Sequence, residues 1–369
     1  MFSNISIIGD GAMGTVLAML LCEKKLTAED AENAEKLPPR RHKDTKKDVS
    51  HEEARKTRVT SHKVKMWGYD SEQLKQIEEA GENKKFLPGY KLPDGLVFEA
   101  DDERIMAGAD LIISAVPCQF MRRIWNRLKD YVPRDAAIVS VAKGIENGTL
   151  LRPTQILAEI LSLGQNGKLA ALSGPTISDE LARKLPATAC AASTNENLAK
   201  DVQQTFNTSW FRVYTNTDIL GVELAGAMKN IIAIAAGIVD GIGAGDNAKA
   251  ALLSRGLAEI TRLGIACGAR PQTFAGLTGL GDLVTTCISP KGRNRSFGER
   301  IGKGQGTEQA CRATESVIEG VDTCKSVVAL ARRYNVEMPI TEAVYQILFE
   351  GKPVNRAIAD LMERRPKAE

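Results

Sequence analysis

The stretch "ISIIGDGAMGTVLAMLL", residues 5–21, determines the fold that we expect for this chain. A short β-branched run, Ile5–Ile8, comes first and is typical of a buried strand. The turn GDGAMG follows at once, and the apolar run TVLAMLL after it has the composition of a helix. Strand, glycine turn and helix in this order predict the first unit of a parallel sheet covered by helices on both faces.

The three glycines of this turn, Gly9, Gly11 and Gly14, have the G-x-G-x-x-G spacing of a dinucleotide-binding loop. The first glycine permits a tight turn, the second lets the backbone approach a pyrophosphate, and the third lets helix pack on strand. A glycine turn used only for packing is the alternative. Because the turn joins a strand to a helix N-terminus, where free N–H groups bind anions, we expect a dinucleotide.

The position that reads the ribose of the cofactor should lie at the end of the second strand, where "MWGYD" places Tyr69 and Asp70. Asp70 follows Gly14 by 56 residues instead of the usual ~20, and an insertion accounts for most of the excess. Asp70 could hydrogen-bond a ribose hydroxyl and favour NAD, whereas Lys63 and Lys65 could equally accept a 2′-phosphate. The sequence leaves the choice between NAD and NADP open.

Further buried strands alternate with helical stretches along the first part of the chain, as in βαβ units. They are expected at Val64–Trp67, Leu111–Val116, Ala137–Ala142 and Leu169–Leu172. Beyond about Asn216 the strand signal stops and long helical patterns follow. We therefore predict an α/β protein with an N-terminal Rossmann-like, doubly wound domain over residues 1–215 and a C-terminal all-helical domain over residues 216–369.

A charged segment of about residues 24–63 separates the first helix from the second strand and resembles an insertion. Its 12 lysines and arginines face 8 aspartates and glutamates, so it holds the excess of positive charge in a chain of net charge +3. No general basic surface for nucleic acid is left. "TAED" at Thr27 and "SHEE" at Ser50 resemble capping boxes and predict two short helices.

This insertion is interpreted mainly as a solvated excursion, with a partner-binding or regulatory segment as the alternative. Its histidines are expected to be ordinary surface residues, and they are His42, His51 and His62.

Composition places the chain among soluble globular proteins, with 43% hydrophobic and 26% charged residues. We expect no signal peptide and no membrane span, because the longest apolar run, Leu224–Val239, is shorter than ~20 residues and contains a lysine. The cysteines form no CxxC pair, which indicates reduced thiols in a cytosolic protein and no metal site. They are Cys22, Cys118, Cys190, Cys267, Cys287, Cys311 and Cys324.

Lys229 is the only charged residue in that apolar run, within "VELAGAMKNIIAIAAGIVDG" at residues 222–241. The helix has no polar face where the ammonium could reach water, so the side chain must be buried, paired or catalytic. Hydride transfer to a carbonyl needs a proton donor, and desolvation lowers the pKa of a lysine into a useful range. The alternative is a lysine whose ammonium snorkels to the surface.

Two further motifs contain polar side chains in an apolar or glycine-rich setting. Asp282 is the only charged residue of "AGLTGLGDLVTTC", and a buried carboxylate needs a cationic partner, for which Lys229 is the natural candidate. Arg293-Asn294-Arg295 in "KGRNRSF" suits a phosphate or carboxylate, with an exposed basic turn as the alternative.

Two loops that follow strands complete the candidate site. "SVAKGIE" places Lys143 just after one strand, and "LSGPTISDE" places Ser173, Gly174 and Thr176 after another. Because parallel sheets bind ligands at the carboxyl ends of their strands, both loops are expected near substrate and nicotinamide.

Together these motifs resemble the NAD(P)-dependent glycerol-3-phosphate dehydrogenase family. GxGxxGT, "VAKGIE", "SGPT", the Lys229 motif, "GLGDLVTTC", "RNRSFG" and "EMPITEAVYQIL" occur in the family's order, over nearly the whole chain except about residues 24–63. The resemblance implies a cytoplasmic homodimer without membrane spans. It also implies reduction of dihydroxyacetone phosphate to sn-glycerol 3-phosphate with NAD(P)H, for phospholipid synthesis.

Matched motif to motif, the resemblance assigns the residues to roles. The catalytic residues would be Lys229, as proton donor and acceptor, with Asp282 and Lys143. The substrate site would comprise Lys143, Gly174, Thr176, Lys229, Asp282, Gly292, Arg293 and Asn294, with Thr286 nearby. The cofactor would contact Gly9, Gly11, Ala12, Met13, Gly14, Tyr69, Lys143, Ser178, Arg293, Val317 and Glu319.

The chain departs from the family pattern at Ala12-Met13, where an aromatic residue is frequent, at Gly292 in place of serine, and at Ser178 in place of alanine. Two rival functions remain. One is a related dehydrogenase acting on a hydroxy acid or acyl substrate, and the other is a dinucleotide-sensing regulator that uses the insertion to bind a partner.

Overall fold

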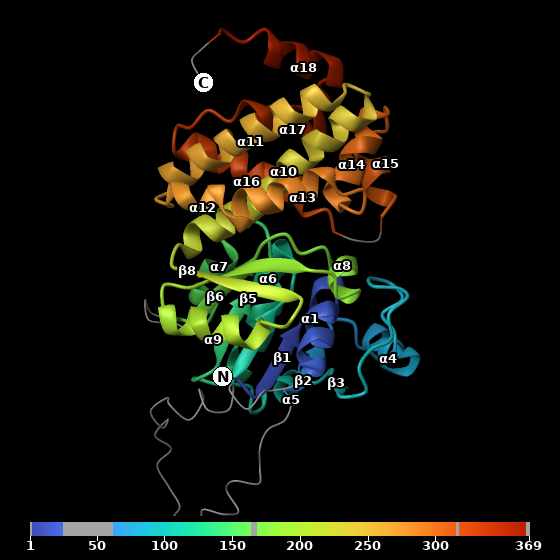
Figure 1. Cartoon of the computed structure of the whole chain (residues 1–369), viewed down its shortest axis with the longest axis vertical. Helices are drawn as coiled ribbons and strands as arrows, with labels where there is room; N and C mark the ends of the chain where they lie inside the picture. The colour runs from blue at the N-terminus through green and yellow to red at the C-terminus, as the bar shows by residue number, and fades with distance from the viewer. Residues whose placement is uncertain (1, 25–61, 164–167, 315–316, 367–369) are drawn as a thin grey trace, which may run out of the picture.

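The computed structural model describes residues 2–24, 62–163, 168–314 and 317–366, which form a sheet domain and a helical domain stacked on it (Figure 1). The two short helices expected near Thr27 and Ser50, together with His42 and His51, lie outside the described residues. His62 is described and does not fit the prediction of a surface histidine. It is only 4% exposed, and its Nδ1 lies 2.9 Å from the carbonyl oxygen of Phe2.

The sheet has eight strands in the order β3-β2-β1-β4-β5-β6-β7-β8. All neighbours are parallel except β6 and β7, and the first six strands have the order of a doubly wound dinucleotide-binding sheet. The strands are β1 (Asn4–Ile8), β2 (Lys63–Trp67), β3 (Leu96–Phe98), β4 (Leu111–Ser114), β5 (Ala137–Ser140), β6 (Leu169–Ser173), β7 (Ala187–Ala192) and β8 (Phe211–Asn216).

Every strand expected from the sequence is present, although β4 and β5 end two residues earlier than predicted, where their loops turn toward the site. Three strands were not predicted. β3 has only three residues, and the alanine-rich β7 lacks the β-branched residues that favour strands. β8 alternates buried and exposed side chains at its start, which was a usable signal.

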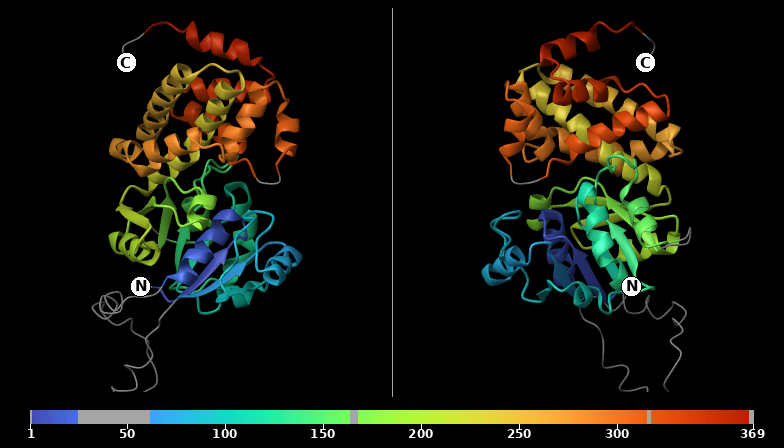
Figure 2. Two further views of the ribbon diagram at one scale, coloured as in Figure 1. Left: turned by 45° about the vertical axis from the view of Figure 1, so that its right-hand side comes forward. Right: turned by 180° about the vertical axis from the view of Figure 1, so that it is seen from behind.

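Helices cover both faces of the sheet (Figure 2). One face carries α1, which contacts α8 and α9, and the other carries α6, which contacts α5 and α7. These helices, with α4 at the edge, are α1 (Ala12–Glu23), α4 (Ser71–Ala80), α5 (Asp102–Met106), α6 (Cys118–Leu128), α7 (Pro153–Ile160), α8 (Ser178–Ala182) and α9 (Glu196–Phe206).

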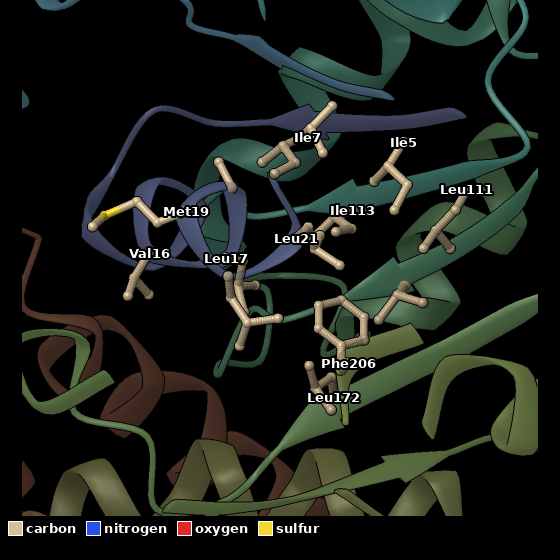
Figure 3. Close-up of a cluster of buried hydrophobic side chains, with 14 of the residues drawn as sticks. Ile5, Ile7, Val16, Leu17, Met19, Leu21, Leu111, Ile113, Leu172 and Phe206 are labelled. Atoms are coloured by element: carbon tan, nitrogen blue, oxygen red, sulfur yellow. The ribbon is translucent and has the colours of Figure 1, made fainter. Parts of the chain in front are cut away.

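The core of the sheet domain lies between β1, its neighbouring strands and α1 (Figure 3). Ile5 and Ile7 of β1 face Leu17 and Leu21 of α1, and Phe206 of α9 closes the cluster. All five side chains are at most 1% exposed. This packing holds β1 and α1 in a fixed relation, and it therefore also positions the glycine turn that joins them.

The helical domain surrounds a central helix, α10 (Ile219–Gly241), which also contacts β6 of the sheet. By length and composition α10 could span a membrane, but 94% of its most apolar window is buried inside the protein, so packing accounts for its composition. Around or beyond it lie α11 (Asp246–Ala266), α12 (Pro271–Ala275), α13 (Asp282–Ile288), α14 (Arg293–Gly302), α15 (Thr307–Arg312), α16 (Glu319–Arg333), α17 (Pro339–Phe349) and α18 (Val354–Met362).

Four glycines, Gly237 and Gly241 of α10 and Gly298 and Gly302 of α14, form a glycine seam where the two helices meet backbone to backbone. A Cβ added to Gly298 would lie 2.0 Å from the carbonyl oxygen of Ile234, and Cβ atoms at Gly237 and Gly241 would lie 1.9 Å and 2.4 Å from carbonyl oxygens of α14. Only glycine permits this approach. The seam therefore fixes the first turn of α14 relative to α10.

Candidate active site

The glycine turn has the geometry that a pyrophosphate requires. Gly9 has φ +119°, and a Cβ on it would lie 2.8 Å from the carbonyl oxygen of Ala115. A Cβ on Gly14 would lie 2.0 Å from the carbonyl oxygen of Gly9, so helix and turn are in direct contact. Gly11 faces open space and begins α1 without a side-chain cap. The first N–H groups of α1 are thus available to an anion, and the turn fits a dinucleotide.

A small, narrow pocket lies between α1 and the loops that follow β5 and β6. Met13 lines it from α1, Lys143 from the loop after β5, and Thr176 from the loop after β6. One helix and two loops that are distant in the sequence therefore meet at this pocket.

A lysine–aspartate cluster, Lys143, Lys229 and Asp282, joins the two domains at the same edge. Lys229 Nζ on α10 donates to Asp282 Oδ1 on α13 at 2.8 Å and also to Thr286 Oγ1, and Lys143 Nζ donates to Asp282 Oδ2 at 2.6 Å. Lys229 is 6% exposed and Asp282 2% exposed. The expected pairing of the two buried charges is confirmed, and the snorkelling alternative for Lys229 is wrong.

Burial and charge set opposite pKa shifts within this cluster. Desolvation lowers the pKa of Lys229 to about 8; Asp282 opposes this shift and Lys143 adds to it. Burial alone would raise the pKa of Asp282, but Lys143 and Lys229 outweigh it and hold that pKa below its ordinary value. The cluster thus keeps an ionised carboxylate beside an ammonium that can release its proton near neutral pH.

The loop after β6 holds Lys143 in place through backbone. Lys143 Nζ donates to the carbonyl oxygen of Gly174 at 2.9 Å, and Thr176 Oγ1 donates to the same oxygen at 3.1 Å. Gly174 has φ +141°, and a Cβ on it would lie 2.9 Å from Cα of Ala189. Glycine is therefore required at this position, and the SGPT motif supplies it.

The motif Arg293-Asn294-Arg295 divides into three environments at the start of α14. Arg293 is exposed, and its Nη1 donates to the carbonyl oxygen of Val317 at 3.3 Å. Asn294 is 9% exposed, and its Oδ1 accepts from the backbone N–H of Gly320 at 3.0 Å. Arg295 pairs with Asp240 at 2.6 Å. Only Arg293 matches the exposed-turn alternative, because the other two side chains are fixed within the helical domain.

Glu319, at the start of α16, belongs to the same electrostatic environment. Burial raises its pKa, and Arg293, Lys143 and Lys229 oppose that rise. Gly292, the residue before α14, offers only backbone. The residues taken from "KGRN" and "SVIEG" thus lie on the helical side of the lysine–aspartate cluster.

The other end of the candidate cofactor site differs from the prediction. Tyr69 is 55% exposed after β2, with the guanidinium of Arg123 4.5 Å from its ring centroid. Asp70 caps α4, since Oδ1 accepts from the backbone N–H groups of Glu72 and Gln73. Lys63 begins β2, and Lys65 Nζ donates to carbonyl oxygens of Arg104 and Ala107. Neither lysine lies at the carboxyl end of β2, which argues against a 2′-phosphate contact, and the alternative that they accept one stays a prediction.

One interdomain contact beside this site has no clear sequence signal. Asp179, next to Ser178 in α8, accepts from Tyr90 Oη at 2.8 Å and pairs with Lys291 of the helical domain and with Arg183 at 3.1 Å. Lys291 lies in the loop that leads to Arg293. The ion pair therefore ties the loop before α14 in the helical domain to α8 in the sheet domain.

The described residues contain no group of three His, Cys, Asp or Glu side chains arranged to hold a metal ion. A dinucleotide-binding sheet domain, joined to a helical domain that brings a buried lysine to the cofactor edge, defines a two-domain nicotinamide-dependent dehydrogenase.

Comparison with known proteins narrows this class. The N-terminal region of NAD-dependent glycerol-3-phosphate dehydrogenase matches residues 4–199, and its C-terminal region matches residues 218–359. The chain belongs to the NAD-dependent glycerol-3-phosphate dehydrogenase family.

Relatives match over the whole chain. Glycerol-3-phosphate dehydrogenase [NAD(P)+] of Geobacter sp. (strain M21) is 43% identical and covers 100% of this chain and 99% of its own length. The corresponding protein of Chlorobium phaeobacteroides is also 43% identical, over 99% of each chain. The crystal structure of glycerol-3-phosphate dehydrogenase from Coxiella burnetii is 33% identical, with a TM-score of 0.83 over 98% of this chain and 99% of that one. A D-mandelate dehydrogenase, 12% identical with a TM-score of 0.55, shares the fold alone.

Proposed function

We propose that this chain reduces dihydroxyacetone phosphate to sn-glycerol 3-phosphate with NAD(P)H, in the cytoplasm, as a homodimer, and for glycerophospholipid synthesis. The observation that carries the proposal is the lysine–aspartate cluster at the domain junction, where Lys143 lines the same pocket as Met13 of α1. The choice of substrate rests on the family to which the chain belongs, and the proposed proton transfer rests on the geometry of the cluster.

Lys229 is the proposed proton donor. A reduced nicotinamide, when bound, supplies a hydride to the ketone carbon, and the carbonyl oxygen then needs a proton. A pKa of about 8 leaves Lys229 mostly protonated at neutral pH and still acidic enough to donate. Asp282 holds the ammonium in position, and Thr286, which accepts from the same nitrogen, fixes its direction.

Lys143 is proposed to contact both substrate and cofactor. Its ammonium lies beside Asp282 and is held by Gly174, so it adds positive charge next to the oxygen that becomes an alkoxide. Thr176 and the backbone of Gly174 form the wall of the site on the sheet side.

The phosphate of the substrate is proposed to bind at the start of α14. Arg293 offers a guanidinium, the backbone N–H groups after Gly292 form a helix N-terminus, and Asn294 contributes its amide. Together they would complement the dianionic phosphate. Val317 and Glu319 are proposed to contact the cofactor, with Arg293 between them and the substrate.

On the sheet side, Gly9, Gly11, Ala12, Met13 and Gly14 are the proposed contacts of the pyrophosphate and nicotinamide. Tyr69 is proposed to contact the adenosine, and Ser178 the middle of the cofactor, beside the interdomain ion pair of Asp179.

The direct test adds dihydroxyacetone phosphate to the purified protein with NADH or NADPH and follows consumption of the reduced cofactor by its near-ultraviolet absorbance. Wild type should consume cofactor, and Lys229→Ala should not. Inorganic phosphate should compete with the substrate. If a 2-keto acid is turned over instead and phosphate does not compete, the hydroxy-acid alternative replaces this function. If dinucleotide binds but no ketone is reduced, the sensor alternative does.

A further inference from the structure

A carboxylate from the glycine turn lies against the carboxyl end of β2. Asp10 lies in the glycine turn between Gly9 and Gly11, yet its carboxylate reaches across to the residue after β2. A Cβ built on Gly68 would lie 2.9 Å from both Cγ and Oδ2 of Asp10. The carboxylate of the turn therefore touches the strand end where dinucleotide-binding domains read the adenosine ribose.

Asp10 is held in this orientation by two neighbours. Gln73 Nε2, in the first turns of α4, donates to Asp10 Oδ2 at 2.6 Å. Asn83, which is fully buried, donates from Nδ2 to the backbone carbonyl of Asp10 at 2.7 Å and to Thr15 Oγ1 at 2.8 Å. The side chain of Asp10 is half-buried, so its charge is less screened than that of a surface residue.

Asp70, the acidic residue expected to read the ribose at the end of β2, caps helix α4. Asp70 accepts two backbone N–H groups at the start of α4, as an N-cap, and lies on the exposed side of the turn. Two cations are also near, Lys85, which donates to Gln73 Oε1 at 3.0 Å, and Arg123, which lies over Tyr69. Both are exposed, whereas Asp10 is the charge in contact with the strand end.

We propose that Asp10 accepts hydrogen bonds from the adenosine ribose hydroxyls and makes this chain select NADH over NADPH. The inference rests on the proposed function, because it concerns the same cofactor site. A carboxylate accepts from hydroxyl groups, and Gln73 occupies only part of its capacity. A 2′-phosphate at the same place would bring like charges together in a partly desolvated site. Asp10 of the glycine turn, and no residue of β2, would thereby determine the preference for NADH over NADPH.

The test measures binding and does not depend on turnover. Dissociation constants for NADH and NADPH are determined by titration calorimetry for wild type, Asp10→Asn and Asp70→Asn. Adenosine 2′,5′-bisphosphate and ADP serve as probes of the adenosine end alone. Asp10→Asn keeps the size of the side chain and an acceptor for Gln73, and Asp70→Asn keeps the helix cap, because asparagine caps as well as aspartate.

Wild type should bind NADH at least about tenfold more tightly than NADPH, as expected for one like-charge contact at a partly buried site. Added salt should reduce this ratio. Asp10→Asn should bring the two dissociation constants within about threefold of each other, mainly by tightening NADPH and the 2′,5′-bisphosphate, and Asp70→Asn should leave the ratio unchanged.

Equal or tighter binding of NADPH by wild type overturns the inference, even if a variant cannot be purified. So does an Asp70→Asn variant that moves the ratio as far as Asp10→Asn, since the strand end would then read the ribose. If neither dinucleotide binds, the proposed function itself fails. Turnover of dihydroxyacetone phosphate with a preference for NADPH would leave that function intact and remove only this inference.

Discussion

The charge balance around Lys229 leads to a prediction about pH that concerns both directions of the reaction. If Lys229 is the proton donor, as proposed, reduction needs its protonated form and oxidation of glycerol 3-phosphate needs its neutral form. With a pKa of about 8, the protonated fraction falls from about nine tenths at about pH 7 to about one tenth at about pH 9. We therefore expect kcat/KM for reduction to fall about tenfold over this range, and kcat/KM for oxidation to rise by a similar factor.

Two substitutions should move this transition in opposite directions. Asp282 raises the pKa of Lys229 and Lys143 lowers it. Asp282→Asn should therefore shift the transition to lower pH, and Lys143→Gln should shift it to higher pH, although both variants lose activity. Lys229→Arg should abolish the transition, because guanidinium stays protonated throughout. These shifts separate an electrostatic role from a merely structural one, which would lower rates without moving the profile.

The assay measures initial rates in both directions at a series of pH values with constant ionic strength. Because kcat/KM reports the free protein, the transition can be compared directly with the pKa of Lys229 before substrate binds. An unchanged profile in Lys229→Arg, or shifts of the same sign in Asp282→Asn and Lys143→Gln, would refute the assignment of Lys229 as the titrating proton donor.

Three further predictions concern packing, phosphate binding and stability. Gly298→Ala should lower the free energy of unfolding by about 1–3 kcal/mol in urea titrations, since its Cβ would lie 2.0 Å from the carbonyl oxygen of Ile234; an increase would contradict the seam. Arg293→Ala should raise KM for dihydroxyacetone phosphate about 10- to 100-fold and weaken competition by inorganic phosphate, whereas unchanged competition would locate the phosphate elsewhere. Burial raises the pKa of Glu259 to about 7. Between about pH 4.5 and 7 the folded state therefore binds more protons than the unfolded state, so the free energy of unfolding should fall as pH rises through that window. Glu259→Gln should flatten this slope in unfolding measured across pH, and an equal slope would rule out Glu259 as its origin.

Much of the candidate site could be predicted because its charged side chains stand in otherwise apolar segments of the sequence. Lys229 and Asp282 are lone charges in apolar segments, and burial of a charge requires a partner, so composition made each a natural candidate for the other, and the structure shows the contact. The GxGxxG turn could also be predicted, because a Cβ at Gly9 or Gly14 would clash with neighbouring backbone and only glycine fits there.

Other parts depended on tertiary contacts that no local pattern carries. Asp70 had the right position for reading a ribose, but local hydrogen bonding makes it a helix cap, and Asp10 reaches the same place from a different loop. The pairing of Asp179 with Lys291 joins two domains and has no periodicity to reveal it. The burial of His62 against Phe2 likewise depends on how the chain meets β1 after the insertion.

The glycine seam also bears on how this protein can evolve. Gly237, Gly241, Gly298 and Gly302 are not among the proposed substrate contacts, yet α14 carries the proposed phosphate-binding turn and α10 carries Lys229. A side chain at any of them would push the two halves of the site apart. In a library of variants selected for growth, these four positions should tolerate as little change as the proton donor, and purifying selection would act on them as if they took part in the chemistry.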